Sequence, residues 1–288
     1  MYAITGITGK VGGALARELV TAHQPVRAVV RDADKAREWA ALGCDIAFAS
    51  MNDPSALAAA FEGAQGVFIL PPPEFDPSPG FPEARAVIDA VMTALEWARP
   101  AKILCLSTIG AQAAETNLLT QRTLMEQALS TLAIPVTFLR PAWFMENFAW
   151  DVAAARDEGV LVSFLQPLDK AVPMIATEDI GRVAAELIQQ DWHGHRIVEL
   201  EAEHRISPNE AAAAFAKVLG HPVKAQVVAR ETWTDLFKSQ GMKDPQPRMR
   251  MLDGFNEGWI EFESDSADIV KGQTKLETVL RGLVARAA

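Results

Sequence analysis

Residues 1–13 read Met1-Tyr2-Ala3-Ile4-Thr5-Gly6-Ile7-Thr8-Gly9-Lys10-Val11-Gly12-Gly13, and this stretch decides the fold. The apolar run from Tyr2 to Thr5 predicts a strand, and apolar residues from Val11 to Ala22 recur with the period of a helix. Strand, glycine-rich turn and helix in this order predict the unit that binds the pyrophosphate of a dinucleotide. The alternative is a purely structural turn between a strand and a helix.

Each glycine of the turn meets a different steric demand. We expect Gly6 to form the tight turn, Gly9 to let the backbone approach the phosphates, and Gly12 to let the helix pack on the strand. The N-terminus of the helix then offers free N–H groups and the positive end of its dipole to the anion. The expected cofactor contacts from this motif are Gly6, Thr8, Gly9, Lys10, Val11 and Gly12.

Composition narrows the class of protein. The chain has 288 residues, of which 49% are hydrophobic, and a net charge of −10, which argues against nucleic-acid binding. We find no uncharged stretch long enough to span a bilayer and no secretory signal, so we expect no membrane association. Cys44 and Cys105 both lie in strand-like runs, which favours buried thiols and a cytoplasmic location.

Strand and helix patterns alternate through the first half of the chain. This order predicts an α/β protein with a doubly wound, parallel Rossmann-type sheet, covered on both faces by helices. The expected strands are 2–5, 25–30, 44–48, 65–70, 102–106 and 135–140, and the expected helices are 11–22, 33–42, 54–61, 82–98 and 116–131.

The pattern loosens after about residue 150. We interpret 1–150 as the NAD(P)-binding domain and 151–288 as a smaller α/β substrate lobe, with segments near 171–200 returning to the first domain. Expected helices here are 151–158, 178–190, 209–219, 230–240 and 276–287, and expected strands are 171–175 and 196–200.

The residue that ends the second strand selects the cofactor, because it meets the adenosine ribose. If Val30 is the last residue in the sheet, Arg31 points at the ribose, with Lys35 and Lys10 nearby. Three cations favour the 2′-phosphate, and therefore NADP(H) over NAD(H). A shift of one residue would place Asp32 there and favour NAD(H).

Several motifs resemble the atypical short-chain dehydrogenases of the NmrA-like group, which includes NADPH-dependent quinone reductases and triphenylmethane dye reductases. The resemblance covers essentially the whole chain. It is carried by Thr5–Gly12, Val30-Arg31-Asp32 with Lys35-Ala36, Asn52–Leu57, Thr137–Asn147 and Pro173–Gly181.

The resemblance implies that Leu70, Pro71 and Pro72 lie along the cofactor. It implies that the segment after the sixth strand lies near the nicotinamide, through Pro141, Ala142, Trp143 and Phe144.

The sequence departs from the family in two places. Ser50 stands where an acidic residue is usual. The positions of the Tyr-x-x-x-Lys pair of larger relatives fall on Leu118 and Arg122, and the only tyrosine is Tyr2. Arg122 is still expected to hold a ribose hydroxyl.

Without that tyrosine, reactions that need a tuned proton donor are disfavoured. Hydride transfer to a planar, electron-poor acceptor such as a quinone or dye needs position and a dry, flat cavity instead. Expected walls are Phe75, Phe81, Trp143, Phe144, Phe148 and Trp150, with Asn147 as a hydrogen-bonding group, although several of these aromatic residues fit a core position equally well.

The remaining candidates are weaker. Ser107-Thr108 ends the fifth strand, where relatives place a catalytic serine, and His193 and His195 have no further metal ligands nearby. We interpret Glu199, Glu201 and Glu203 as a solvated strand face. We expect a small-molecule acceptor as partner, no metal, and exposed apolar helices suited to a homodimer. The alternative function is an NADP(H)-sensing regulatory protein without turnover, which would require a protein partner.

Overall fold

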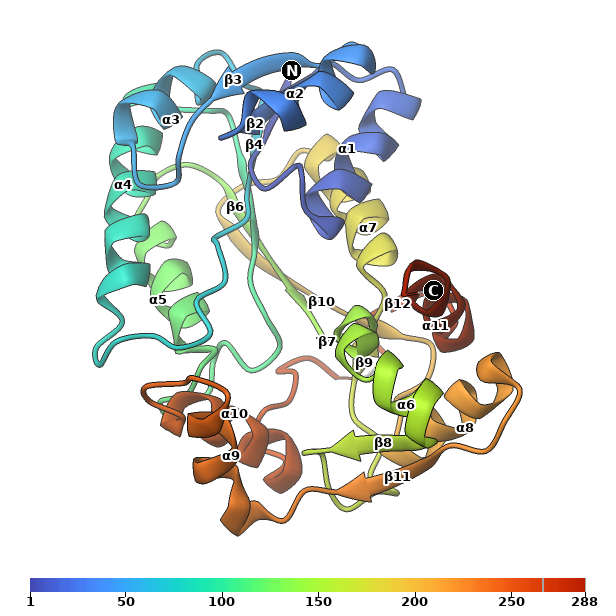
Figure 1. Ribbon diagram of the computed structural model, residues 1–288. Coiled ribbons are helices and arrows are strands. Elements are labelled where there is room, and N and C mark those ends of the chain that lie inside the picture. Colours follow the sequence, from blue (N-terminus) through green and yellow to red (C-terminus); the bar gives the residue numbers. More distant parts are fainter. Residues whose placement is uncertain (266, 288) are drawn as a thin grey trace.

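A single parallel sheet organises the chain. The computed structural model describes residues 1–265 and 267–287. Eight strands lie in the order β12-β10-β6-β5-β4-β1-β2-β3, and every neighbouring pair is parallel (Figure 1). The order reverses direction at β1, so the switch point lies between β1 and β4, where such sheets bind ligands. The predicted doubly wound α/β class is confirmed.

The sheet strands are short and apolar because both of their faces are covered. Their bounds are β1 Tyr2–Ile4, β2 Val26–Val30, β3 Asp45–Phe48, β4 Gly66–Ile69, β5 Ile103–Leu106, β6 Val136–Pro141, β10 His195–Ala202 and β12 Val270–Gly272.

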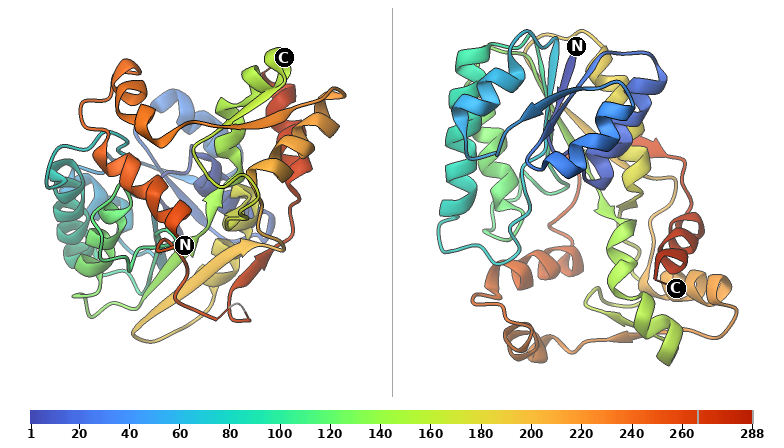
Figure 2. Two further views of the ribbon diagram at one scale, coloured as in Figure 1. Left: turned by 90° about the horizontal axis from the view of Figure 1, so that it is seen from below. Right: turned by 45° about the horizontal axis from the view of Figure 1, so that its top comes forward.

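Two layers of helices cover the sheet (Figure 2). One face carries α1 (Lys10–Thr21), α2 (Ala33–Ala41) and α7 (Thr177–Gln189), whose apolar sides join one core cluster. The other face carries α3 (Pro54–Phe61), α4 (Pro82–Ala98) and α5 (Thr120–Leu129), which form a second cluster.

A smaller lobe lies beyond the carboxyl ends of the strands, at the bottom of Figure 1. It holds two small parallel pairs, β8 with β11 and β7 with β9. Its elements are β7 Trp143–Phe144, η1 Met145–Trp150, α6 Val152–Glu158, β8 Val160–Ser163, β9 Met174–Ile175, α8 Pro208–Leu219, β11 Lys224–Val227, η2 Arg230–Thr232, α9 Trp233–Ser239, α10 Gln246–Glu257 and α11 Leu276–Arg286.

Several expected boundaries were wrong. The helix expected at 116–131 is only α5, because Asn117 and Thr120 form a hydrogen-bonded turn ahead of it. The helix expected at 230–240 is divided into η2 and α9. Six elements had no counterpart among the predicted segments: β7, η1, β8, β11, α10 and β12.

The prediction that Glu199, Glu201 and Glu203 form a solvated face was wrong for two of the three. Glu199 and Glu201 are 2% and 3% exposed because β10 lies inside the sheet, between β6 and β12. Glu199 accepts from the backbone N–H groups of residues 263 and 264 and lies 3.9 Å from Arg140. Glu201 pairs with Lys271 and Arg205. Only Glu203 is exposed.

Arg140 is the cation at the centre of this buried network. Its side chain is 5% exposed and holds both carboxylate oxygens of Glu126, at 2.9 and 2.6 Å, and also contacts Glu263. We therefore expect Arg140→Met to lower the free energy of unfolding by about 3–5 kcal/mol, because buried Glu126 and Glu199 would lose their counter-charge. Urea unfolding followed by circular dichroism measures this.

The matched control for that substitution is Arg156→Met. Arg156 pairs with Asp157 at the surface, so its loss is expected to leave the urea midpoint nearly unchanged. Equal midpoints for wild type and Arg140→Met would show that the buried network contributes nothing to stability.

Candidate functional site

The glycine turn between β1 and α1 has the backbone that the sequence predicted. Gly6 adopts φ +63°, a left-handed conformation that favours glycine. A Cβ at Gly12 would lie 2.4 Å from the Gly6 carbonyl oxygen, so a side chain there would force α1 off the turn. A Cβ at Gly9 would meet only that same oxygen, at 3.2 Å, and otherwise projects into open space.

The N-terminus of α1 is free to receive an anion. Gly9 is the residue before the helix, no side chain caps it, and the first turn holds no acidic residue. Lys10, the first residue of the helix, is exposed, whereas Val11 and Gly12 are buried against the core. Free N–H groups, a positive dipole end and an exposed cation therefore lie together at the switch point of the sheet.

Thr5 joins this turn to the loop after β4, a role that the sequence analysis missed. Its hydroxyl donates to the Phe68 carbonyl at 2.9 Å and accepts from the Leu70 N–H at 2.8 Å. Leu70 consequently packs 3.1 Å from the position of a Cβ on Gly6. The structure thus brings Leu70 beside the glycine turn. Pro71, which follows it, is buried, and Pro72 is exposed.

The end of β2 presents cations without carboxylate partners. Val30 is the last residue of the strand, and Arg31 follows it. Asp32 is engaged as the cap of α2, because its carboxylate accepts from the Asp34 N–H at 2.8 Å. Lys10, Arg31 and Lys35 are exposed, and in the described part of the chain none forms an ion pair.

A buried carboxylate, that of Glu146, fixes the segment after β6 in place. This role was not predicted from the sequence. Glu146 accepts from the Thr177 backbone N–H, at 2.9 and 3.0 Å, and from its hydroxyl, at 2.6 Å. This contact fixes η1 against the N-terminus of α7. Asn147 is exposed beside it, and its side chain forms no hydrogen bond with the described residues. Pro141 and Ala142 are buried under this segment.

The aromatic residues of this segment divide into packed and exposed groups. Trp143 packs edge-on against Phe255 with ring centres 5.2 Å apart, and Phe148 packs against Phe215 at 6.0 Å. These two contacts hold β7 against α10 and η1 against α8, and half-buried Phe144 packs on the same core cluster.

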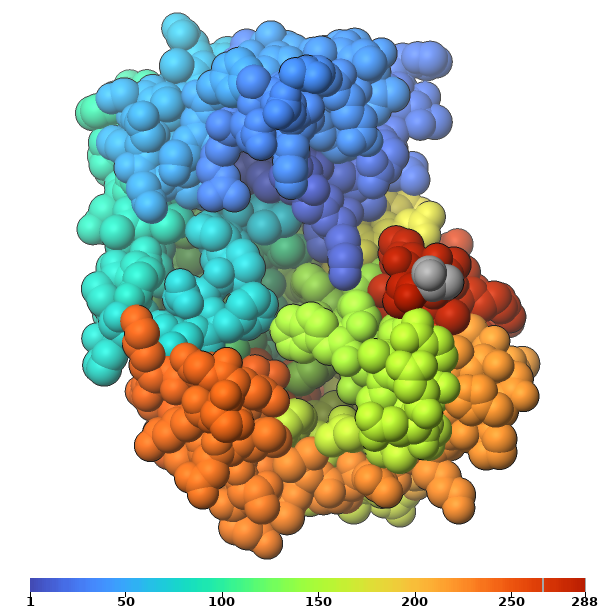
Figure 3. All heavy atoms as spheres, viewed as in Figure 1, coloured from blue at the N-terminus to red at the C-terminus, as the bar shows by residue number. Residues whose placement is uncertain are grey.

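Phe75 and Trp150 form the exposed group. They are 53% and 69% exposed and touch edge to face at 6.3 Å. Figure 3 shows the surface hollowed between the blue-to-teal sheet domain and the lime and orange lobe. The teal loop after β4 and the lime segment η1, which carry Phe75 and Trp150, border this hollow.

Ser107 and Arg122 lie at the carboxyl end of β5. The Ser107 hydroxyl is buried and has no hydrogen-bond partner in the described structure. Burial lowers the pKa of half-buried Arg122, whose guanidinium forms no ion pair with the described residues and lies near Cys105. Leu118, at the position of the missing tyrosine, is buried and apolar. The Ser107 hydroxyl and the Arg122 guanidinium are therefore available to a bound molecule, but Leu118 has no group that can supply a proton.

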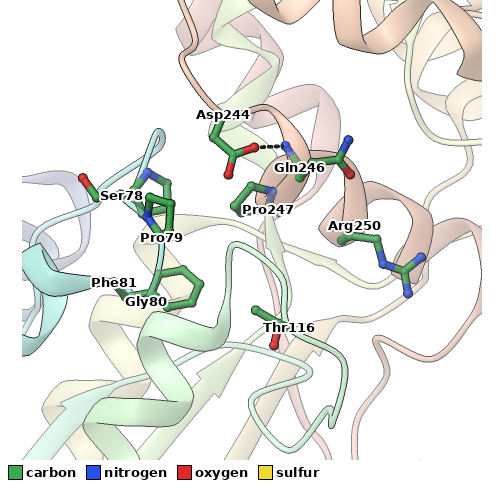
Figure 4. A pocket seen from close by; sticks show the side chains of 10 residues that line it. Ser78, Pro79, Gly80, Phe81, Thr116, Asp244, Gln246, Pro247 and Arg250 are labelled. Carbon is green, nitrogen blue, oxygen red and sulfur yellow. Dashed lines mark hydrogen bonds between the residues drawn. The ribbon is translucent and has the colours of Figure 1, made fainter.

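A separate pocket of about 210 Å³ lies between residues 77–81, in the loop between β4 and α4, and the start of α10 (Figure 4). It is lined by that loop, including Phe81, and by the start of α10, including Pro247 and Arg250. Phe81 is 7% exposed, so it is a packed residue of this pocket and not a wall of the hollow beside Phe75. Drug-sized ligands occupy pockets of about 300 Å³ or more, so this one is too small for a dinucleotide.

Residues 1–265 and 267–287 hold no group of three or more His, Cys, Asp or Glu side chains placed to bind a metal ion. Over the same residues, no helix has both the length and the apolar character required to cross a membrane.

The fold and the turn together define a Rossmann-type nucleotide-binding protein. Its family follows from comparison with known sequences: the NmrA-like family matches residues 2–258, and the chain belongs to it. The resemblance found in the sequence motifs is thereby confirmed.

Relatives with assigned activities are similar over most of their length. The NAD(P)H azoreductase of Xenophilus azovorans is 29% identical over 85% of this chain and 82% of its own. Quinone oxidoreductase 2 of Escherichia coli is 28% identical over 85% of this chain and 83% of its own length.

Solved structures share the fold. The NADPH-dependent quinone oxidoreductase of Escherichia coli, complexed with NADPH, superposes with a TM-score of 0.82 at 24% identity, covering 98% of this chain and 99% of that one. The Citrobacter triphenylmethane reductase complexed with NADP(H) superposes with a TM-score of 0.80 at 23% identity, covering 98% of this chain and 99% of that one.

Gly9→Val is expected to abolish binding of both NADPH and NADH, because its branched side chain would occupy the open space at the helix N-terminus. Isothermal titration calorimetry measures both affinities. Gly282→Val on α11 is the matched control, since the nearest atom to a Cβ there is 3.7 Å away. Retained NADPH affinity in Gly9→Val would place the phosphates elsewhere.

Asp151, between η1 and α6, gives the stability of this segment a pH dependence. Burial raises its pKa to about 7. An unfolded aspartate ionises near pH 4, whereas the folded state keeps Asp151 protonated up to about pH 7. The free energy of unfolding therefore falls as pH rises from about 4 to about 7.

Asp151→Asn is expected to reduce this fall, measured as the difference in melting temperature between pH 5 and pH 8. Asp169→Asn, in an exposed turn, is the control. An unchanged slope in Asp151→Asn would mean that the carboxyl is solvated.

Proposed function

We propose that this protein is an NADPH-dependent reductase that delivers a hydride to a planar, electron-poor acceptor such as a quinone or a dye. The observation that carries the proposal is the uncapped N-terminus of α1, open at Gly9, at the switch point of the sheet. Beyond this edge the surface is hollowed between the sheet domain and the smaller lobe, where the segments of Phe75 and Trp150 meet (Figure 3). The named activities of the azoreductase and quinone oxidoreductase relatives support it.

The described residues fit a nicotinamide dinucleotide. The turn from Gly6 to Gly12 would hold the pyrophosphate, and Leu70 to Pro72 would lie along it. The orphaned Ser107 hydroxyl and the unpaired Arg122 guanidinium provide polar groups at the end of β5 for the nicotinamide half. When bound, the reduced cofactor would supply the hydride.

The chain's own contribution to the chemistry is position and exclusion of water. Because Leu118 replaces a tyrosine and Arg122 is a permanently charged group, neither can act as a tuned proton donor. A quinone or an azo bond can be reduced without one, since water protonates the reduced product. The aromatic faces of Phe75 and Trp150 suit a flat acceptor.

Preference for NADPH over NADH rests on Arg31. Arg31 follows the last residue of β2, and the Asp32 carboxylate is occupied in capping α2. The cationic Arg31, and not the acidic Asp32, would therefore meet the 2′-position of the ribose. Arg31→Ala is expected to weaken NADPH binding by about 1.5–3 kcal/mol more than NADH binding, because a charged hydrogen bond is lost. Calorimetric titration of both cofactors measures the difference.

Arg37→Ala is the control for that substitution. It removes a cation from the same helix, but one that pairs with Asp34 at 2.6 Å, so the NADPH-to-NADH ratio should not change. An equal loss of both cofactors in Arg31→Ala would place Arg31 away from the 2′-phosphate.

A second candidate is an NADP(H)-sensing regulatory protein without turnover. The observation that favours it is the apolar Leu118 where larger relatives hold a catalytic tyrosine. This function requires a protein partner whose affinity differs between the oxidised and reduced cofactor.

NADPH consumption by the purified protein separates the two functions. The panel comprises quinones, azo dyes, triarylmethane dyes and enones, with NADPH binding confirmed in the same samples. Turnover with one class is the expected result for the reductase. Binding without turnover on the whole panel would contradict the reductase and favour the sensor.

A further inference from the structure

Arg248 on α10 is a half-buried cation without a carboxylate partner in the described part of the chain. Its guanidinium carbon lies 4.5 Å from the ring centre of Phe237 and 6.0 Å from that of Trp150. Its one polar contact with the described residues is the Met242 sulfur, 4.0 Å from Nη1. Unused N–H donors and a positive charge are therefore held between two aromatic faces.

Other arginines of this lobe show what Arg248 lacks. Arg230 also lies over a tryptophan ring, 4.7 Å from the centre of Trp233, but it donates to both oxygens of Asp253 at 2.6 and 2.8 Å. Arg205 is likewise paired with Glu261. Burial lowers the pKa of Arg248, as expected for a cation without a counter-charge, yet a guanidinium remains protonated at neutral pH.

Two carboxylates of segments that adjoin α10 accept from backbone N–H groups. The two oxygens of Asp76 accept from the backbone N–H groups of Lys243 and Asp244, at 2.9 and 3.0 Å. Asp244 itself accepts from the Gln246 N–H. These bonds tie the loop after β4 to the start of α10, and among the described residues neither carboxylate forms an ion pair with Arg248.

Arg248 lies at the edge of the hollow proposed for the acceptor. Its neighbour Trp150 touches Phe75, which belongs to the loop after β4, and Phe237 belongs to α9. Trp150 is three residues after Asn147, in the segment η1 that follows the carboxyl end of β6. Side chains from η1, α9 and the turn before α10 therefore contact this one cation, and exposed Phe75 is linked to it through Trp150.

We propose that Arg248, flanked by Trp150 and Phe237, forms a subsite for an anionic group, a carboxylate or a sulfonate, on the planar acceptor. The proposal rests on the reductase function above and names the class of acceptor. A guanidinium matches the two oxygens of such an anion, and the binding compensates a half-buried charge that is otherwise unpaired. The Trp150 face stacks on the aromatic ring that carries the anion.

A pair of matched probes tests the subsite by binding alone. We would titrate the full chain, with and without NADP⁺, with 2-naphthalenesulfonate and with its neutral counterpart 2-naphthalenesulfonamide, following tryptophan fluorescence and calorimetry. The wild type is expected to bind the sulfonate about 10- to 100-fold more tightly, the range for a hydrogen bond to a charged group. Arg248→Met should remove this preference and leave the affinity for the sulfonamide unchanged.

Two further variants keep the test decisive. Arg250→Met is the matched control, because Arg250 lies near Asp253 at 3.7 Å and faces the outer pocket, and it should keep the preference. Arg248→Lys preserves the charge and should keep part of the preference for the sulfonate. If Arg248→Met lowers the melting temperature, the result for Arg248→Lys still shows whether the preference depends on the positive charge.

Turnover separates failure of the subsite from failure of the reductase. For sulfonated against unsubstituted naphthoquinones, Arg248→Met is expected to raise KM for the sulfonated compounds and leave kcat little changed. Equal probe affinities in wild type and Arg248→Met would overturn the subsite even if quinones are reduced. A sulfonate preference lost in Arg248→Met, without turnover of any acceptor, would support the anion subsite and contradict the reductase function.

Discussion

Two glycines, Gly12 and Gly181, set the packing on which the proposed nucleotide-binding edge depends. A Cβ at Gly12 would lie 2.4 Å from the Gly6 carbonyl oxygen, and a Cβ at Gly181 would lie 2.4 Å from the Cβ of Ala14. Helix α1 is therefore held closely between its own turn and α7, and its N-terminus lies beside Leu70 at the switch point. Any larger residue at either position would push α1 outward and move its free N–H groups away from the edge.

The sheet was predictable because strands covered on both faces must be apolar along their whole length, as in Val67–Ile69 and Ile103–Leu106. The smaller lobe was harder to predict. Helix α10 carries Pro247 and several charged residues, which hide its apolar side, and β12 has only three residues. Glu199 and Glu201 look like a solvated face because Arg140, Lys271 and the strands that bury β10 are distant in sequence, while nearby Arg205 gives no sign of burial.

In the candidate site too, local motifs were predictable and contacts between residues distant in sequence were not. The glycine turn, Arg31 and the segment 141–147 are contiguous motifs, so the sequence alone predicts them. The residues that fix them in place are long-range partners: Thr5 holds Leu70, and Glu146 holds the start of α7 at Thr177. Arg248 became a candidate only when the fold placed it against Trp150, because nothing near it in the sequence indicates an aromatic neighbour or a missing carboxylate.

A crystal structure of the chain grown with NADP⁺ tests the central claim most directly, that the carboxyl edge of the sheet at β1 and β4 holds the dinucleotide. Density for the pyrophosphate at the N–H groups that begin α1, with the 2′-phosphate beside Arg31, is the result expected. Density at another edge of the sheet, or a pyrophosphate far from Gly9, would contradict the account.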